Sequence, residues 1–351
     1  MQSTRRASPS QKVSDTFFPS DGNLNPFHEA KVNMHRQRRD FLAASLGHAV
    51  SWGGAVSLAG VVASGNSPAA AREPIRRTGP PRFTLGLAAY SLRNYFRYMR
   101  GKERQPAGDG PPLDMIGFLD YCVAQRCDSA ELTGYFFPPD ANRATFRRVK
   151  KAAFLRGMAI AGTAIGNNFT VGRGPRLDEE ISEAVRWIDR AVWMGAPHIR
   201  FFAGTAAQLA EHPDRMTEAI DAIHHCAEHA ARRGVVIGIE NHGRLSADQM
   251  LEIMRRIDSP WVGINLDTGN FHSEDPYDDL RRCAPFAVNV QVKSMMKSAS
   301  GEEFPADFGR IATILGDAGY QGHVVLEYEE ANPYEGIPEA LSRLRESLAA
   351  A

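Results

Sequence analysis

The sequence lacks several patterns that would assign a function at once. It has no excess of charge, because 41 Lys and Arg residues balance 41 Asp and Glu residues among its 351 residues. It has no Cys-x-x-Cys pair either: the four cysteines stand apart at Cys122, Cys127, Cys226 and Cys283. These absences argue against a basic nucleic-acid-binding face and against a zinc ribbon. They favour buried thiols over a disulfide or a metal ligand.

Glycine-rich nucleotide-binding loops are missing as well. No GxGxxG motif follows the first predicted strand, and no P-loop or glycine cluster at a helix start offers a phosphate site. The sequence therefore gives no support to a dinucleotide-binding sheet.

The leader, residues 1–71, differs from the rest of the chain. Arg38 and Arg39 in RQRRDFL stand just ahead of a weakly apolar, Gly/Ala-rich run at 42–63, and three alanines at 69–71 offer a small-residue cleavage site. This order predicts a twin-arginine signal peptide and export to the periplasm or another extracytoplasmic compartment. A disordered basic leader and an uncleaved anchor are the alternatives.

The apolar run of the leader makes a poor membrane span, because it contains His48 and several glycines. No stable membrane span is therefore expected. Residues 1–33 are polar, so translation from Met34 is a second interpretation of the start. A linker at 72–82 would then lead into one domain at 83–351.

From residue 83 onward, short apolar runs alternate with amphipathic stretches, which predicts strands alternating with helices. The predicted strands lie at 83–90, 128–133, 158–165, 198–204, 235–240, 261–267, 287–293 and 323–329. The predicted helices lie at 113–126, 141–156, 178–194, 213–233, 245–257, 306–318 and 336–349, with PYDDLRRC as a shorter one. Eight such units in about 270 residues favour an α/β fold of the (β/α)8 TIM-barrel type over a doubly wound sheet.

The helix predicted at 213–233 contains a histidine pair that needs an explanation. Its buried face is predicted from apolar residues at spacings of three and four: Met216, Ile220, Ile223, Ala227 and Ala230. His225 and His229 stand four apart on another face and could in principle bind a metal together. A solvated helix surface is the favoured interpretation, since no residue of the predicted barrel end lies near them.

Oxygen-bearing side chains recur at the predicted carboxyl ends of four consecutive strands. They are Glu240 in GIENHG, Asp267 in NLDTGN, Gln291 in VNVQVKS and Glu327 in VVLEYEE. In barrels of this type the carboxyl ends of the strands form the active site. Three converging carboxylates would repel one another, so a divalent cation is the natural partner, with Mn²⁺, Mg²⁺ or Co²⁺ favoured over Zn²⁺. Taken singly, Glu240 or Glu327 would more often be a salt-bridged residue of the rim, and Gln291 would be unremarkable.

Together, IEN with the following His, NLDTGN, VQVK and LEYE resemble the xylose isomerase-like TIM-barrel superfamily, within it the sugar phosphate isomerase/epimerase branch. The resemblance covers about residues 83–349. Its motifs are moderately specific for the fold and the metal site and weakly specific for the substrate. It implies that one divalent metal is bound by Glu240, Asp267, Gln291 and Glu327.

Two positions depart from the family pattern. The third ligand is usually a His, whereas Gln291 offers only an amide oxygen, a weaker and harder donor. Many ketose epimerases of the family have a His three residues after the Asp, where this chain has Asn270. The exact reaction and the substrate therefore stay open.

Other polar residues near the predicted rim indicate a polyol pocket. Glu131 in AELTGYFF is followed by aromatic residues that would stack on a sugar ring, and Arg200 lies near the end of the fourth strand. The candidates for substrate binding are Glu131, Arg200, His242, Asn270 and Lys293. Each has a plainer interpretation as a hydrogen-bonding residue of the rim.

The predicted function is a metal-dependent sugar epimerase or isomerase of carbohydrate metabolism. The metal would bind adjacent carbonyl and hydroxyl oxygens of a sugar or keto-sugar and stabilise an enediolate, with Glu240 and Glu327 as base and acid on its two faces. A keto-sugar lyase or dehydratase on the same site is one alternative, and Gln291 keeps a non-catalytic sugar-binding barrel as another. A DNA-repair nuclease shares the barrel but would need further histidines and a basic groove. A homo-oligomer is compatible with the sequence.

Overall fold

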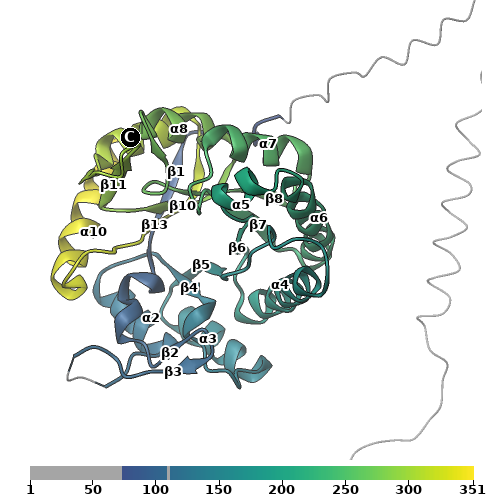
Figure 1. The fold of residues 1–351 in the computed structure, drawn as a ribbon. Coiled ribbons are helices and arrows are strands. Elements are labelled where there is room, and N and C mark those ends of the chain that lie inside the picture. The colour runs from purple at the N-terminus through teal and green to yellow at the C-terminus, as the bar shows by residue number, and fades with distance from the viewer. Residues whose placement is uncertain (1–72, 109–110) are drawn as a thin grey trace, which may run out of the picture. The chain divides into compact units, whose positions relative to one another are not determined.

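Eight parallel strands close into a barrel in the computed structural model, and helices surround it (Figure 1). The structure describes residues 73–108 and 111–351, and one compact unit spans Ser67–Ala351. The predicted (β/α)8 barrel is confirmed. The predicted signal peptide at 1–71 and the alternative start at Met34 lie outside the described residues and stay predictions.

The barrel strands follow one another in chain order around the closed sheet. They are β1 (Arg82–Ala88), β4 (Ser129–Thr133), β5 (Ala159–Ala164), β6 (His198–Phe202), β7 (Val236–Glu240), β8 (Val262–Asp267), β10 (Ala287–Val292) and β13 (Gln321–Leu326). Neighbouring strands are parallel throughout, and β1 closes the barrel between β13 and β4. Each predicted strand is therefore a barrel strand, with its ends displaced by a few residues.

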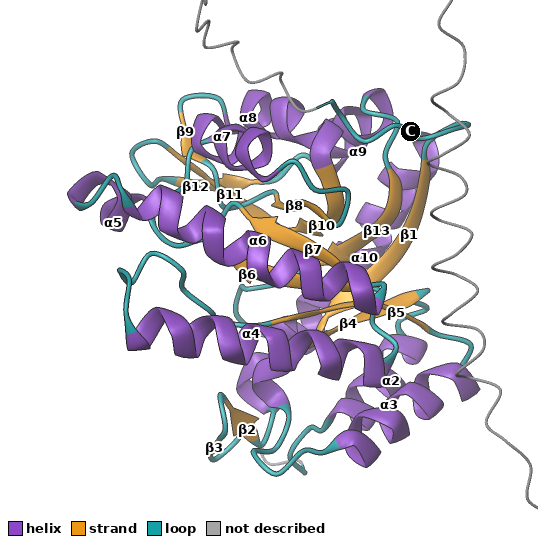
Figure 2. Cartoon of the chain, turned by 90° about the vertical axis from the view of Figure 1, so that its right-hand side faces the viewer, coloured by secondary structure: helices purple, strands orange, loops and turns teal. Residues whose placement is uncertain are grey.

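Helices on the outside of the barrel connect the strands (Figure 2). They are α2 (Met115–Ala124), α3 (Arg143–Leu155), α4 (Pro175–Met194), α6 (Arg215–Arg233), α7 (Ala247–Ile257), α8 (Pro276–Cys283), α9 (Phe308–Asp317) and α10 (Pro333–Ala350). Local signals set their ends: the Asn142 side chain accepts from two backbone N–H groups at the start of α3, and Gly195, with φ of 78°, ends α4. No helix in the described ranges is long and apolar enough to cross a membrane.

Shorter elements occupy the connections between these strands and helices. They are η1 (Ala89–Tyr95), β2 (Tyr98–Met99), β3 (Lys102–Glu103), η2 (Gly134–Phe136), α5 (Ala206–Glu211), β9 (His272–Ser273), η3 (Ala284–Phe286), β11 (Met295–Ser298) and β12 (Glu303–Pro305). The sequence did not predict them, because a segment of two to seven residues is too short to show a clear period. All except η3 follow the carboxyl end of a barrel strand, so they build up the same side of the molecule.

The histidine pair of α6 belongs to the helix surface, as expected. His225 is exposed, and Nε2 of His229 lies 3.0 Å from Oδ1 of Asp189 on α4. The predicted apolar face is buried except for Met216, which is partly exposed. All four cysteines are buried free thiols, which confirms that prediction too.

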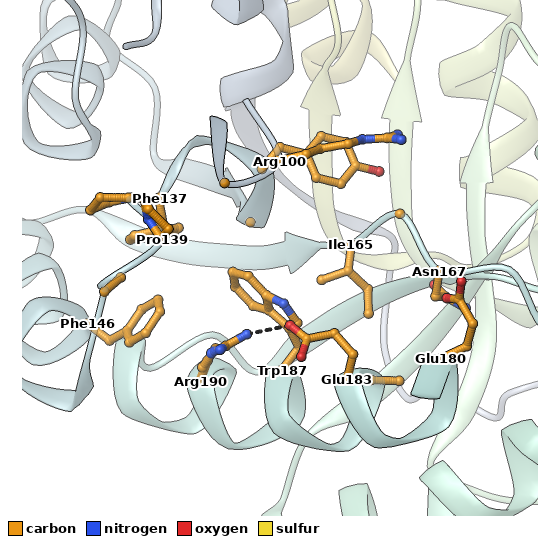
Figure 3. Close-up of a pocket in the computed structure, with 17 residues that line it drawn as sticks. Arg100, Phe137, Pro139, Phe146, Ile165, Asn167, Glu180, Glu183, Trp187 and Arg190 are labelled. Carbon is orange, nitrogen blue, oxygen red and sulfur yellow. Dashed lines mark hydrogen bonds and ion pairs between the residues drawn. The ribbon is translucent and has the colours of Figure 1, made fainter. Parts of the chain in front are cut away.

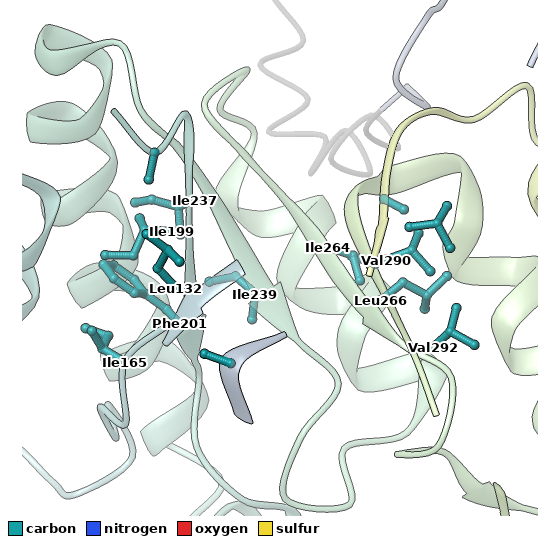
Figure 4. Close-up of a cluster of buried hydrophobic side chains, with 14 of the residues drawn as sticks. Leu132, Ile165, Ile199, Phe201, Ile237, Ile239, Ile264, Leu266, Val290 and Val292 are labelled. Atoms are coloured by element: carbon teal, nitrogen blue, oxygen red, sulfur yellow. The ribbon is translucent and has the colours of Figure 1, made fainter. Parts of the chain in front are cut away.

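Alternate residues along each strand face opposite sides of the barrel wall. One set is apolar and lies between strands and helices, as Figure 4 shows for Leu132, Ile199, Phe201, Ile237, Ile239, Ile264, Leu266, Val290 and Val292. The alternate positions hold small or polar residues: Ala88, Ala161 and Val325 form a separate small cluster. The large apolar side chains therefore do not fill the barrel interior, and polar side chains can occupy it.

His198 is one such interior side chain, at the start of β6. A Cβ built on Gly162 or Gly238 would lie within 2.5 Å of its ring, so the imidazole fits only because both neighbours are glycines. Neither ring nitrogen has a hydrogen-bond partner among the described residues. Burial, followed by the charges of His323 and Arg200, lowers the pKa of His198 to about 3.

This depressed pKa predicts sensitivity to acid. The folded protein keeps His198 neutral, while the unfolded chain protonates it below about pH 6.5, so stability is lost as the pH falls from 6.5 towards 3. Urea unfolding measures the free energy of unfolding at pH 7 and at pH 4. We expect the loss between pH 7 and pH 4 to be about 3 kcal/mol smaller in His198→Met than in the parent. An identical difference in parent and variant would contradict the prediction.

Candidate active site

The strand register brings four predicted residues to one end of the barrel. Gln291 on β10 pairs with Asp267 at the end of β8 and with Val325 on β13. Glu240 ends the neighbouring β7, and Glu327 is the first residue after β13. Asp267 and Gln291 are fully buried, and Glu240 and Glu327 are only 4% and 7% exposed. The four side chains thus come from four adjacent strands and lie away from bulk water.

Glu240 is held by one cation and one amide. Its Oε2 lies 2.8 Å from Nε of Arg200, and Asn270 Nδ2 donates to its Oε1 at 2.9 Å. Arg200, on β6, also donates from Nη1 to the carbonyl oxygen of Ile165 at 2.9 Å. The guanidinium packs over the ring of Phe202, 4.0 Å from its centroid. Both oxygens of Glu240 therefore have a fixed direction.

Lys293 is the second buried cation of the site. Its Nζ donates to Oε1 of Glu327 at 2.9 Å and lies 2.9 Å from Oε2 of Glu329 and 3.4 Å from Oδ2 of Asp267. Burial alone would lower the pKa of Lys293, but Asp267, Glu327 and Glu329 raise it well above its usual range. The ammonium group therefore stays charged and lies between Asp267 on β8 and Glu327 after β13, the two strands on either side of β10.

Gln291 and two asparagines form an amide network inside the barrel. Gln291 Nε2 donates to Oε1 of Glu131 at 2.9 Å and to Oε2 of Glu327 at 2.8 Å. Its Oε1 accepts from Asn265, which in turn accepts from Asn289 at 2.8 Å. Asn289 also donates to Oε2 of Glu131 at 3.2 Å. In this arrangement Gln291 turns its nitrogen, and not its oxygen, toward the carboxylates.

The buried acids interact strongly with one another. Burial and the charge of Glu327 raise the pKa of Glu131 to about 8. Burial likewise raises the pKa of Glu240 to about 7, against the opposing effect of Arg200. Burial also raises the pKa of Asp267 above its usual range, whereas Lys293 overcomes burial and lowers that of Glu327. The cluster therefore has more carboxylates than its two cations can neutralise.

The donor chemistry of this cluster fits a hard divalent cation. Among the described residues, Arg200 and Lys293 are the cations that form ion pairs with Glu240, Asp267 and Glu327, and Oδ2 of Asp267 is buried there without a hydrogen-bond partner. As the side chains stand, no three Asp, Glu, His or Cys residues of the described ranges are close enough to bind a metal. Glu240, Asp267 and Glu327 would hold the ion once the Lys293 ammonium moved aside. Gln291 would contribute an oxygen only with its amide turned over, so its role as a ligand stays a prediction.

The remaining predicted residues also reach this end of the barrel. His242 follows β7 and stacks on Phe202, with ring centroids 4.0 Å apart. Burial of the ring lowers the pKa of His242, and the charges of Arg200 and Lys293 lower it further, to about 4. The imidazole is therefore neutral at pH 7 and can form hydrogen bonds. Glu131 lies in the middle of β4 and not at its end, which places it deeper in the barrel than the sequence indicated.

Sequence reasoning missed three residues of the cluster: Asn265, Asn289 and Glu329. Asn265 and Asn289 precede Asp267 and Gln291 by two residues, so the period of a strand puts each pair on the same side. That alternation was a usable signal. Glu329 carried the same signal, because it lies two residues after Glu327 in the predicted strand 323–329, although the structure ends β13 at Leu326.

Comparisons with known proteins agree with this architecture. A family model described as "Xylose isomerase-like TIM barrel" matches residues 120–347. The inosose dehydratase of Bacillus thuringiensis (strain Al Hakam) is 28% identical over 282 residues, which cover 68% of this chain and 92% of the relative.

Two solved structures have the same fold. A xylose isomerase domain protein from Planctomyces limnophilus matches with a TM-score of 0.59 and 16% identity, over 78% of this chain and 100% of that one. A structure of D-psicose 3-epimerase with D-tagatose, from Clostridium cellulolyticum H10, matches with a TM-score of 0.60 and 14% identity, over 76% and 99%. Identities this low establish a common fold alone.

Proposed function

The chain belongs to the xylose isomerase-like TIM barrel family, and we propose that it removes a proton from the carbon next to the carbonyl group of a keto-sugar or related polyhydroxy ketone. The observation that carries this proposal is the pair of buried carboxylates, Glu240 and Glu327. Arg200 pairs with Glu240, and Lys293 pairs with Glu327, so each carboxylate has its own cation from another part of the barrel. Two oriented acid–base groups at the carboxyl end of one barrel suit proton transfer on a small polar substrate.

Glu240 is the base in this proposal. Arg200 and Asn270 fix its two oxygens, so that it meets the substrate in one orientation. The electron pair of the broken C–H bond moves into the C–C bond and onto the carbonyl oxygen, giving an enediolate. A divalent ion held by the carboxylates would polarise that carbonyl and make the C–H bond more acidic. Glu131, His242 and Lys293 offer hydrogen bonds to the substrate hydroxyls.

Glu327, paired with Lys293, then determines which product forms. Return of a proton to the opposite face of the carbon gives an epimer. Return to the neighbouring carbon gives an isomer. If a hydroxyl group leaves instead, it takes a proton, and the products are water and an unsaturated ketone. Dehydration is a second candidate because the curated relatives at 28% identity are named inosose dehydratases.

The test is deuterium uptake by ketoses and cyclic keto-polyols in D₂O, with the full chain and added Mn²⁺ or Co²⁺. Proton NMR reports exchange and epimers, and ultraviolet absorbance reports an unsaturated ketone. We expect exchange with at least one substrate, and a loss of about 10³-fold in Asp267→Asn, whose amide cannot neutralise a cation.

Metal content of the same two proteins gives an independent readout. One equivalent of divalent ion in the parent and none in Asp267→Asn is the expected result. A parent that takes up no Mn²⁺ or Co²⁺ and exchanges no proton with any substrate would rule out the proposal and leave a sugar-binding barrel.

A further inference from the structure

A cavity of about 360 Å³ lies next to the candidate active site (Figure 3). Its inner wall is formed by Gly134 and Tyr135, directly after β4, and by Ile165 and Gly166, directly after β5. Helix α4 forms the opposite wall. Because both inner segments leave the carboxyl ends of barrel strands, the cavity is on the same side of the barrel as the carboxylates.

A hydrogen bond followed by an ion pair joins the cavity wall to the proposed base. The carbonyl oxygen of Ile165 accepts from Nη1 of Arg200, whose Nε lies 2.8 Å from Glu240. A single guanidinium group therefore separates the cavity wall from the Glu240 carboxylate. A substrate bound at Glu240 would reach the cavity past the Arg200 guanidinium.

Four aromatic side chains lie in the cavity wall. The indole of Trp187 on α4 lies against the Gly134 backbone, where a Cβ would come within 2.6 Å of it. The rings of Phe137 and Phe146 lie 6.3 and 6.1 Å from the Trp187 ring. Tyr135 is 8% exposed, and its buried hydroxyl has no hydrogen-bond partner among the described residues. Flat apolar faces with a free hydroxyl at the edge suit a ring that has both apolar and hydroxyl-bearing faces.

The charges around the cavity are balanced. Glu183 and Arg190 form an ion pair of 2.7 Å, drawn in Figure 3, and Arg190 lies 4.7 Å from the Trp187 ring centroid. Arg100, stacked 4.5 Å over the Tyr135 ring, and Glu180, which accepts from the backbone N–H of Asn168, also line the cavity. With two arginines and two carboxylates in its lining, the cavity carries no net charge that would attract an anionic group, which is compatible with a neutral occupant.

We propose that this cavity binds a second, neutral sugar ring, joined by a glycosidic bond to the keto-sugar that reacts at Glu240. The inference rests on the proposed function, since it makes the substrate a keto-disaccharide and not a free or phosphorylated ketose. The volume is within the range of small-ligand pockets and is large enough for one ring. Trp187 supplies the stacking face, and the Tyr135 hydroxyl binds a ring hydroxyl.

The test compares a keto-glucoside carrying a methyl group with the matching keto-disaccharide, using the full chain loaded with Mn²⁺. We expect KM for the disaccharide to be about tenfold lower, because the second ring buries apolar surface on Trp187. Trp187→Ala, and Ala141→Trp, which fills the cavity from the loop ahead of α3, should each reduce that ratio to about one. Trp261→Ala, just ahead of β8 and outside the cavity, is the matched control and should keep the tenfold ratio.

Equal KM values in the parent, or a ratio that survives both cavity variants, would overturn the inference. If neither compound is turned over, the proposed function fails, and calorimetric titration with the disaccharide decides about the cavity separately. Binding to the parent that is lost in Ala141→Trp would keep the cavity assignment. Absence of binding to the parent would remove it.

Discussion

Replacing Glu240 by glutamine is expected to reduce deuterium uptake by the substrate about 10³-fold. Glutamine has the same shape and can still accept from Asn270, but its amide cannot take a proton from carbon. The measurement is the exchange rate by proton NMR, with metal content and thermal unfolding recorded on the same sample. Glu228→Gln, an exposed acid on α6, is the matched control and should exchange like the parent.

The companion variant Glu327→Gln separates removal of the proton from its return. If Glu240 removes the proton and Glu327 returns it, Glu327→Gln should still exchange deuterium but form the epimer or the unsaturated ketone at least about 100-fold more slowly. Equal loss of exchange and product in both variants would contradict this division of roles. It would instead indicate that both carboxylates act by holding the metal ion.

The fold could be predicted from the sequence because every barrel strand has its own apolar run. The outward residues of β7, Ile237 and Ile239, are large and alternate with smaller or polar residues, although the register shifts once between β4 and β5 and once between β8 and β10. The same alternation, read at the strand ends, placed Glu240 and Asp267 on one rim. These features depend on local pattern and on the closure of parallel strands, both of which the sequence contains.

The details of the site depended on register and on segments far apart in the chain. Gln291 was expected to offer its oxygen to a metal, but its direction is decided by Glu131, 160 residues earlier. Lys293 was expected to bind substrate, yet its ammonium lies between Asp267 and Glu327. No local pattern signals such a contact. The aromatic cavity has the same origin, because Tyr135 and Trp187 come together only through the packing of α4 on the loop after β4.

Replacing Lys293 by methionine is expected to destabilise the metal-free protein by about 3–5 kcal/mol, the usual cost of leaving a buried charge without its partner. Methionine fills most of the same volume, so the loss would report charge and not packing. Urea unfolding in the presence of EDTA measures it. Lys297→Met is the matched control: its ion pair with Glu303 is exposed, at 3.0 Å, and should contribute about 1 kcal/mol or less.

The Lys293→Met variant also tests whether the Lys293 ammonium occupies the place of a divalent ion. With Lys293 absent, Asp267 and Glu327 have no cation between them, and a divalent ion can neutralise both at once. Added Mn²⁺ should therefore restore the stability of Lys293→Met to within about 1 kcal/mol of the parent, following the usual linkage between binding and folding. If the variant is as stable as the parent in EDTA, the acids have taken up protons in place of the ammonium charge. If it is unstable and Mn²⁺ has no effect, the carboxylates do not form a cation site, and the negative charge that develops on the substrate would be stabilised by Arg200 and Lys293 alone.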